Sequence, residues 1–338
     1  MPKLKRLIYL AYYLKQMDWS LLRRFMDHTQ QVRRYGRGHQ LLLIAWDSLR
    51  YNISPLEWYQ FGFADLTRQE KITWAGTGTM YEFQLRANPP VARDVLDDKR
   101  LFYKAYKQFF RHVVYEREAL TTHPEVLDEL LRRYDRLVLK AANGKCGRSV
   151  RFIETACWQA GELLAAMQNE GHDLLETPIE QHPDLNSLSP SGVNTVRIVT
   201  ALDANEQPYL LGCRLRISVN SSVDNLAAGN LAAPVDEQSG RVIGPGVYSD
   251  ITQQPEKEHP VTRLRIQGFQ IPHWDACLQM ALEAQKLLTQ NRSVGWDIAV
   301  TPQGPGLIEG NHDWCKLVWQ MPVRQGLKVM LDEVPHVK

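Results

Sequence analysis

Residues 294–311 read VGWDIAVTPQGPGLIEGN, two strand-like runs joined by a turn rich in proline and glycine. Side chains alternate between the two faces of a β-strand, so Glu309 and Asn311 project from one side. If the turn centres on Gln303, Asp297 lies directly opposite Glu309 on the paired strand. The apolar residues that alternate with these polar ones indicate that the other face is core. The stretch therefore predicts an antiparallel sheet with a polar patch on its second face.

This polar patch has the composition of a magnesium site. Two carboxylates and a carboxamide on one buried patch are costly without a compensating cation. Mg²⁺ prefers oxygen ligands and commonly shares them with substrate phosphates. We therefore expect Asp297, Glu309 and Asn311 to bind metal. A surface hairpin with solvated acids is the alternative.

Arginines accumulate on the two strand-like runs upstream of this hairpin, at residues 194–201 and 209–219. Arg197 lies on the first run, and Arg214 and Arg216 share a face of the second. Cations that face each other in a sheet repel unless an anion lies between them. That anion is either a bound phosphate or one of the chain's own acids. Asn225, in the polar loop 223–230 that follows, is a further candidate for contact with phosphate or metal.

A second hairpin lies earlier in the chain, where residues 137–140 and 150–153 flank the loop NGKCGRS, residues 143–149. Lys140 ends the first strand, and Gly144 and Gly147 allow main-chain N–H groups to approach phosphate oxygens. Together with Ser149 they are candidates for a phosphate-binding lid. The loop lacks the Gly-Lys-Ser/Thr ending of a Walker motif. An ordinary hairpin loop is the alternative.

The first half of the chain has helical patterns. Helix starts are indicated at residues 54–57 (SPLE) and 122–125 (THPE), each with a hydroxyl residue three positions before a glutamate. Residues 97–102 (DDKRLF) open another helix, with acids in its first turn. Strand-like runs dominate the second half, with one long helix at 272–289. This order predicts an α+β fold with antiparallel strands, unlike the alternating βαβ order of a doubly wound sheet.

Composition excludes several classes of protein. The 338 residues carry a net charge of +2, so no field of the whole protein recruits nucleic acid. The five cysteines are widely spaced and form no Cys-x-x-Cys pair, which favours neither zinc nor a disulfide framework. A reducing compartment, the cytoplasm, fits this pattern best.

The N-terminus combines apolar and basic residues. Residues 7–14 (LIYLAYYL) are too few to span a bilayer and indicate an amphipathic helix packed on the body; a signal-like or interfacial segment is the alternative. Basic residues cluster at 3–6, 23–24 and 33–34. They form either a solvated helical face or a docking surface for an acidic partner or a membrane, so membrane contact is at most peripheral. A homodimer is left open.

Taken in order along the chain, these residues resemble the ATP-grasp superfamily. The order is an entry lysine, a strand lysine with a glycine loop, a hinge with an acid, a strand arginine, an Asn/Gly loop and then Asp … Glu-x-Asn. The closest likeness is to the branch described as sugar-transfer-associated ATP-grasp, related to alpha-L-glutamate ligases. It rests on SGVNTVR at residues 191–197 and on GWDIA … EGN within residues 295–311. The likeness covers about residues 40–325.

The resemblance implies two α+β subdomains whose antiparallel sheets grip ATP, preceded by a mainly helical region. The corresponding divisions are a helical region at 1–94, a first subdomain with glycine loop and hinge at 95–190, a second with the arginine and metal site at 191–325, and a tail at 326–338. The first 90 residues do not show the usual Rossmann-like leading domain, which normally contributes to substrate binding.

The resemblance also implies roles for single residues. Lys99 and Lys140 would be the first and second nucleotide lysines. Residues 176–179 would form the hinge that holds adenine through main-chain groups. Arg197 would steady an acyl phosphate and the tetrahedral intermediate. The implied hinge and ribose contacts are Glu176, Thr177, Ile179 and Glu180.

The implied activity is an ATP-dependent carboxylate–amine ligase that uses ATP and two Mg²⁺ ions and forms an amide through an acyl phosphate. Its small-molecule carboxylate and amine would come from a sugar acid, a cell-surface glycan precursor, an amino acid or a peptide. The alternatives are an ATP-grasp-type kinase that phosphorylates a small molecule and a nucleotide-binding protein without catalytic activity.

Overall fold

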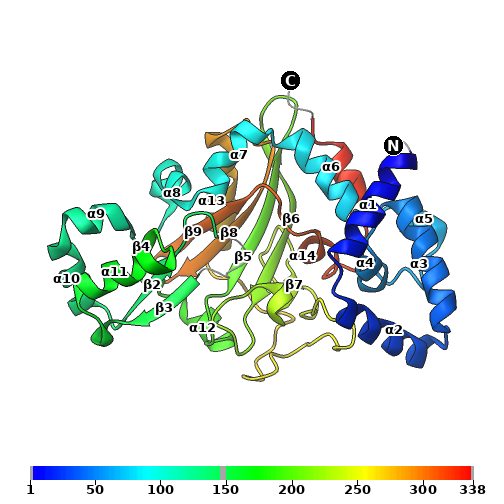
Figure 1. Ribbon diagram of the computed structural model, residues 1–338, viewed down its shortest axis with the longest axis horizontal. Helices are drawn as coiled ribbons and strands as arrows, with labels where there is room; N and C mark the ends of the chain where they lie inside the picture. Colours follow the sequence, from blue (N-terminus) through cyan, green and yellow to red (C-terminus); the bar gives the residue numbers. More distant parts are fainter. Residues whose placement is uncertain (1–2, 145–149, 336–338) are drawn as a thin grey trace.

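The computed structural model describes residues 3–144 and 150–335. Figure 1 shows three regions: N-terminal helices at one end, a small sheet with its helices at the other, and a large sheet between them. The N-terminal helices are α1 (Lys3–Lys15), α2 (Trp19–Arg33), α3 (Arg37–Tyr51), α4 (Pro55–Gln60), α5 (Arg68–Lys71) and α6 (Thr77–Ala87). Helices α7 (Pro90–Asp97) and α8 (Lys99–Tyr106) and the 3₁₀ turn η1 (Lys107–Phe109) lead to the small sheet.

A helix begins at or near each of the three predicted start positions. Ser54 and Glu57 form the capping box at α4, with the Ser54 N–H donating to Glu57 Oε2 at 2.7 Å. Helix α10 begins at Pro124 as predicted, but Thr122 ends α9 and His123 is the N-cap. At α8 the acids do not lie in the first turn. Asp98 is the N-cap and accepts from the Arg100 N–H at 2.8 Å, while Asp97 ends α7.

The small sheet has the strand order β1-β4-β2-β3, and every pairing is antiparallel. The predicted glycine-loop hairpin is its β2–β3 pair. Helices α10 and α11 pack on this sheet through a leucine-rich core. The elements are β1 (Val114–Glu116), α9 (Arg117–Thr122), α10 (Pro124–Arg133), β2 (Arg136–Lys140), β3 (Val150–Glu154), η2 (Thr155–Cys157), α11 (Ala160–Glu170) and β4 (Leu174–Glu176).

The large sheet has the order β7-β6-β5-β8-β9, again antiparallel throughout. Its elements are β5 (Thr195–Leu202), β6 (Pro208–Ile217), β7 (Leu231–Pro234), β8 (Ser293–Thr301) and β9 (Gly304–Asn311). Between and after these strands lie α12 (Pro183–Leu188), η3 (Leu226–Ala228), α13 (Trp274–Leu287), α14 (Lys316–Gln320) and α15 (Lys328–Asp332).

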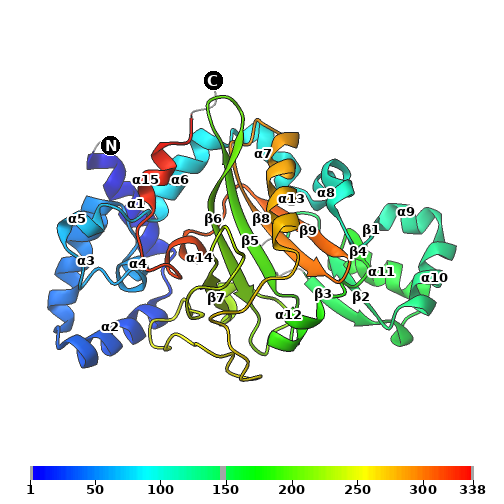
Figure 2. The same ribbon diagram turned by 180° about the vertical axis from the view of Figure 1, so that it is seen from behind.

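The two faces of the large sheet differ in what covers them. One face packs against α13, which Figure 2 shows lying across the strands. Ile198, Leu215 and Trp296 belong to that core. The other face is apolar at one end, where Val199 and Leu211 meet residues of α6 and of the C-terminal segment. At its other end this second face carries the charged residues, because they alternate with the core residues along the strands.

The N-terminal helices are joined to the rest of the chain by buried contacts. Val247 and Met321 are part of the core built mainly from residues 22–74. Lys316 Nζ lies 2.8 Å from Glu57 Oε1, and burial of this lysine opposes its charge while Glu57 outweighs that effect and raises its pKa. A buried ion pair across two regions resists their separation.

The predicted fold class, α+β with two antiparallel sheets after a helical N-terminal region, is confirmed. Strands β1 and β7 were not predicted, because three or four residues give too short a pattern to recognise. In the described part of the chain, no helix is both long and apolar enough to cross a membrane.

Candidate active site

The hairpin of β8 and β9, here called the acid hairpin, pairs Asp297 with Glu309 as predicted, but its turn and register differ from the prediction. Thr301 pairs with Gly304, so the turn centres between Pro302 and Gln303, half a residue earlier than the predicted centre at Gln303. A β-bulge between Asp297 and Ile298 then shifts the register, and Asp297 is opposite Glu309 after all. A bulge beside a cluster of polar groups re-aims side chains at a functional site.

Asp297 lies within an arginine cage. Arg197 donates through Nε to Oδ1 and through Nη2 to Oδ2 of Asp297, the latter at 2.8 Å. Arg216 Nη1 donates to the same Oδ2 at 2.7 Å, and Arg216 Nη2 lies 2.6 Å from Asp224 Oδ1. Burial opposes the charge of Asp297, but the two guanidiniums outweigh it and hold its pKa well below the usual range. The anion between the predicted arginines is therefore the chain's own Asp297.

Glu309 has the opposite electrostatic setting. Its Oε1 accepts from Asn311 Nδ2 at 3.2 Å. Burial, followed by the negative charge of Asp297, raises the pKa of Glu309 above its usual value. A half-buried carboxyl with a raised pKa beside a second carboxylate lacks positive charge, which a divalent cation supplies.

The hairpin residues fit a magnesium ion on these grounds. Glu309 offers its carboxylate oxygens, Asn311 lies beside it with its amide nitrogen donating to Glu309 Oε1, and Asp297 keeps lone pairs beyond those used by the arginines. In the part of the chain that the structure describes, no group of three or more His, Cys, Asp or Glu side chains forms a metal site. Magnesium is commonly bound by one or two carboxylates together with phosphate oxygens and water, so a smaller protein contribution suffices.

Arg214 does not join this cluster. Its Nε donates to the Trp319 main-chain oxygen at 2.9 Å, and its Nη1 donates to the Cys213 oxygen at 2.6 Å. Burial lowers its pKa to about 10. Its guanidinium ties the sheet to α14, and this contact does not support the predicted role in nucleotide binding. Arg216, also predicted to bind nucleotide, is fully engaged by Asp224 and Asp297.

On the small sheet, Lys140 and Glu176 form a buried pair. Lys140 Nζ lies 2.5 Å from Glu176 Oε2, and His112 Nε2 lies 3.3 Å from the same oxygen. Burial raises the pKa of Glu176, but Lys140 and His112 outweigh it and hold the pKa at about 2. Lys140 is thus positioned at the end of β2, beside the predicted loop.

Lys99, the first residue of α8, reaches the start of that loop. Its Nζ donates to the main-chain oxygen of Gly144, and its own N–H donates to Ala142 O at 2.9 Å. Burial lowers the pKa of Lys99, while Glu309 opposes that shift and Lys140 adds to it. Gly147 and Ser149, predicted to line the lid, lie outside the described residues.

The predicted hinge continues directly from β4. The Thr177 N–H donates to Val113 O at 3.0 Å, and Thr177 Oγ1 accepts from the Val113 N–H at 3.0 Å. Thr177 is therefore occupied in linking the hinge to β1. Ile179 is half-buried and Glu180 is exposed, and the main-chain contacts of the described residues leave the Ile179 N–H for a ligand. Asn225 caps η3, accepting from the Ala227 N–H at 3.1 Å.

The two sheets thus place charges of opposite sign within electrostatic reach of each other. Lys99 and Lys140 together exceed Glu176 by one positive charge. On the large sheet three acids (Asp224, Asp297, Glu309) exceed two arginines (Arg197, Arg216) by one negative charge. The effect of Glu309 on the pKa of Lys99 links the two groups. Phosphate suits the first group and a metal ion the second.

Two residues of this arrangement were not identified from the sequence. Asp224 adjoins the predicted Asn225, and only the geometry shows that it, with its Oδ2 2.9 Å from the Thr195 N, anchors Arg216. His112 precedes β1, a strand too short to recognise, so its pairing with Glu176 had no sequence signal.

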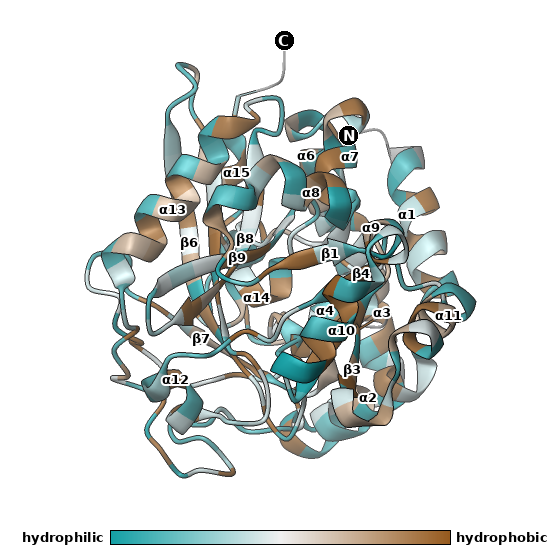
Figure 3. Ribbon diagram, turned by 90° about the vertical axis from the view of Figure 1, so that its left-hand side faces the viewer, coloured by the Kyte–Doolittle hydropathy of each residue, from teal (hydrophilic) through white to brown (hydrophobic). Residues whose placement is uncertain are grey.

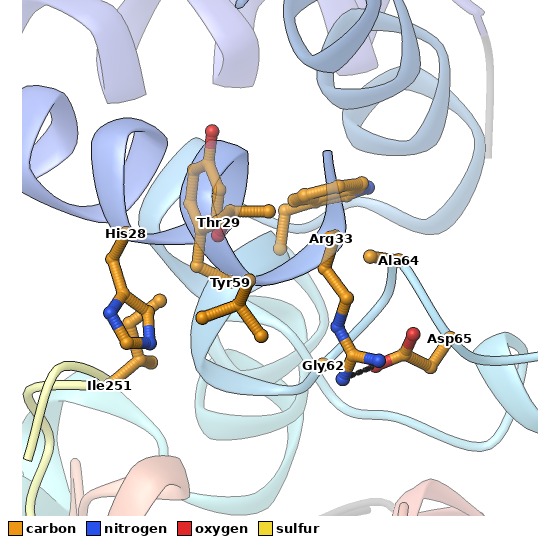
Figure 4. Close-up of a pocket in the computed structure, with 10 residues that line it drawn as sticks. His28, Thr29, Arg33, Tyr59, Gly62, Ala64, Asp65 and Ile251 are labelled. Carbon is orange, nitrogen blue, oxygen red and sulfur yellow. Dashed lines mark ion pairs between the residues drawn. The ribbon is translucent and has the colours of Figure 1, made fainter. Parts of the chain in front are cut away.

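A pocket lies elsewhere, between α2, α4 and the residues that follow α4 (Figure 4). His28, Thr29, Tyr59 and Ile251 line it, and an ion pair joins Arg33 to Asp65 at its edge. None of the predicted nucleotide or metal residues lines this pocket.

Similar solved structures include an L-amino acid ligase from Bacillus licheniformis, with 13% identity over 73% of this chain and 50% of that chain, at a TM-score of 0.42. Others are a RimK domain protein ATP-grasp from Sphaerobacter thermophilus DSM 20745 (14% identity, 72% and 69% coverage, TM-score 0.39) and the D-alanine–D-alanine ligase from Bacillus anthracis (13%, 78% and 79%, 0.38).

These structural likenesses are too distant to bear on activity, and the chain spans only half the length of the first structure. No curated protein sequence matches the chain. The family model described as sugar-transfer associated ATP-grasp matches residues 79–336, about three quarters of the sequence. The chain therefore belongs to the sugar-transfer associated ATP-grasp family.

Proposed function

We propose that this protein is an ATP-dependent carboxylate–amine ligase. The observation that carries the proposal is the pairing of a net positive group, Lys99 and Lys140 with Glu176, with a net negative group around Glu309. A metal–nucleotide complex has both signs of charge and needs both kinds of surface. Family membership supports the same ligand.

In this proposal the lysines bind the phosphates of ATP and offset the negative charge that spreads over the transferred phosphoryl group. Glu309 and Asn311, with Asp297, hold Mg²⁺, of which two ions are expected. A metal held by these residues would supply positive charge that offsets the charge of the phosphates. The Ile179 N–H is the hinge donor that would hold adenine.

Arg197 has a restricted role in the same scheme. Its Nε and Nη2 are engaged with Asp297, which leaves Nη1 to face a substrate oxygen. The Asp297 contact fixes the plane of the guanidinium, so little ordering is lost when it binds an oxyanion. The substrate carboxylate would attack the γ-phosphoryl, ADP would leave, and the amine would displace phosphate from the acyl phosphate.

We further propose a division into a helical region at 1–94, nucleotide subdomains at 95–190 and 191–325, and a tail at 326–338, acting in the cytoplasm. The carboxylate and amine would belong to a sugar acid, a glycan precursor, an amino acid or a peptide; the family description, sugar-transfer associated, favours the first two.

Hydroxylamine trapping tests the proposal. The purified chain is incubated with Mg-ATP, hydroxylamine and pools of sugar acids and amino acids, and both ADP and hydroxamate are measured. A ligase releases ADP only with its carboxylate and gives hydroxamate in equal amount, since hydroxylamine replaces the amine. ADP release with a phosphorylated hydroxyl product and no hydroxamate would identify a kinase instead. Nucleotide binding without ADP release in any pool would identify a non-catalytic binder.

A further inference from the structure

Two N-terminal helices present large apolar side chains to solvent. On α1, Leu7, Ile8 and Tyr12 are each more than half exposed, and on α3, Leu42 and Trp46 are exposed by 74% and 64%. Together these five residues are the α1/α3 surface. Isolated exposed apolar residues are ordinary, but several on adjacent helices mark an interaction site.

The inner faces of both helices are fixed, which sets the direction of these side chains. Arg6 Nη1 on α1 donates to the main-chain oxygens of Leu49 and Arg50 at the end of α3, at 3.0 and 2.8 Å. Tyr13 is buried and its hydroxyl lies 3.3 Å from Asn52 Oδ1. The two helices lie side by side at the same end of the molecule in both Figure 1 and Figure 2.

On α3, buried polar residues and exposed apolar residues lie on opposite faces of the helix. Asp47 and Ser48 are buried, and Asp47 Oδ2 accepts from Trp58 Nε1 at 2.9 Å and from Lys71 Nζ at 2.7 Å. Leu42 and Trp46 are one turn apart and so project together on the opposite face. That outer face therefore has no carboxylate from α3, whose one acid is Asp47.

The charge of this region is strongly positive. Residues 1–50 contain ten Lys and Arg and three Asp, a net charge of +7, while the whole chain carries +2. Helix α1 has no acidic residue. Four of the basic residues pair with carboxylates, among them Lys5 with Glu82 on α6. Lys15 is exposed and lies two turns after Ile8 on the same face of α1.

We propose that the α1/α3 surface docks the protein on an anionic lipid bilayer. Aliphatic side chains, an exposed Tyr and Trp, and an exposed lysine, Lys15, on a helix that contains no acid are the features of an interfacial helix that enters the headgroup region. A second copy of the chain fits less well, since two basic N-terminal regions would repel. The proposal does not depend on the activity of the nucleotide site.

Vesicle flotation tests this with the full chain. Vesicles of phosphatidylcholine are compared with vesicles that also contain about one third phosphatidylglycerol, at about 0.1 M and about 0.5 M salt. The unmodified protein should float with the anionic vesicles and should be released substantially at high salt. Leu42→Ser with Trp46→Ser should weaken binding by about tenfold or more, and Lys15→Glu by a few-fold.

The control is Ile243→Ser with Val261→Ser, which removes two apolar side chains of 56% and 50% exposure from loops outside the N-terminal helices. This variant should bind as the unmodified protein does, and circular dichroism melts confirm folding of all variants. The proposal is overturned if the unmodified protein does not float, or if the control loses as much binding as the Leu42/Trp46 variant. Sedimentation velocity that shows a dimer disrupted only by the Leu42/Trp46 change would assign the surface to self-association instead.

Discussion

The two charged groups of the nucleotide site use the same side-chain types in opposite ways. On the small sheet Glu176 Oε2 lies 2.5 Å from Lys140 Nζ and 3.3 Å from His112 Nε2, and these contacts hold the pKa of Glu176 at about 2. On the large sheet the arginines are engaged by Asp297 and Asp224, and the pKa of Glu309 is raised by burial and by Asp297. The carboxylate of Glu176 has its cations in place, whereas the carboxyl of Glu309 lacks a positive charge.

This difference separates structural acids from a functional one. A buried carboxylate with its cation in place contributes to the fold and has little left to offer a ligand. A buried carboxyl with a raised pKa is a cost to the fold that a ligand can relieve. We therefore assign Glu176 and Asp297 mainly to positioning, and Glu309 with Asn311 to metal binding. Burial also raises the pKa of Asp224, and its assignment to positioning rests instead on its contacts with Arg216 and with the Thr195 main chain.

The largest expected effect is on turnover in Glu309→Gln. The amide removes the negative charge that metal binding needs, so ATP turnover should fall by about a thousandfold or more, roughly 4 kcal/mol of barrier. ADP release at saturating Mg²⁺ measures it. Glu118→Gln, an exposed acid on α9, is the matched control and should retain full activity. Comparable turnover in Glu309→Gln would remove the metal assignment.

Asp297→Asn should have the next largest effect, on stability. It leaves the buried guanidiniums of Arg197 and Arg216 without their shared carboxylate. Removal of one partner of a buried ion pair costs about 3 kcal/mol. Urea unfolding followed by tryptophan fluorescence measures the loss, and Asp128→Asn on the exposed face of α10 should change the free energy of unfolding little. A loss under about 1 kcal/mol would contradict the arginine cage.

Replacement by glutamine at Glu176 and at Glu309 should shift the free energy of unfolding in opposite directions. The folded-state pKa of Glu176 lies at about 2, below its ordinary 4.5, so its contribution is present above about pH 4.5 and is lost as pH falls toward 2. The pKa of Glu309 is raised, so its contribution is present at low pH and is lost as pH rises through that value.

At pH 7 without Mg²⁺, Glu176→Gln should therefore destabilise the protein by about 2 kcal/mol, and Glu309→Gln should stabilise it by about 1 kcal/mol. Urea unfolding of the pair at pH 7 and near pH 4 measures both, and each difference should shrink at the lower pH. Shifts of equal sign would show that the two groups are electrostatically alike.

The acid hairpin shows how much of the site can be predicted from the sequence. Alternation along the strand placed Glu309 and Asn311 on one face. The pairing of Asp297 with Glu309 was predicted from a turn centred on Gln303, and it holds only because the β-bulge offsets the different turn. The alternation is local, so it can be read from neighbouring residues. The fold class followed in the same way, from strand-like runs without βαβ order.

The partners of the arginines could not be read in this manner. Strand alternation placed Arg197, Arg214 and Arg216 on one face but gave no measure of how far each guanidinium extends. Arg214 reaches α14, more than a hundred residues later, and Arg216 reaches a loop acid beside the residue that was chosen. Such pairings depend on tertiary packing between distant segments, which a local sequence pattern does not predict.

A moderate effect is expected for Lys99, which tests the positively charged group of the comparison. Lys99 Nζ contacts Gly144 at the start of the glycine loop, and burial lowers its pKa while Glu309 partly restores it. In Lys99→Met the volume is kept and the charge removed, so the KM for ATP should rise about tenfold, or 1.4 kcal/mol, with kcat changed less than about threefold. Lys104→Met, exposed on the same helix, is the control and should leave both constants unchanged. Because Lys140 remains in place, the loss should be partial. An unchanged KM in Lys99→Met would mean that Lys140 with the loop suffices for phosphate, and that Lys99 serves only to hold Gly144.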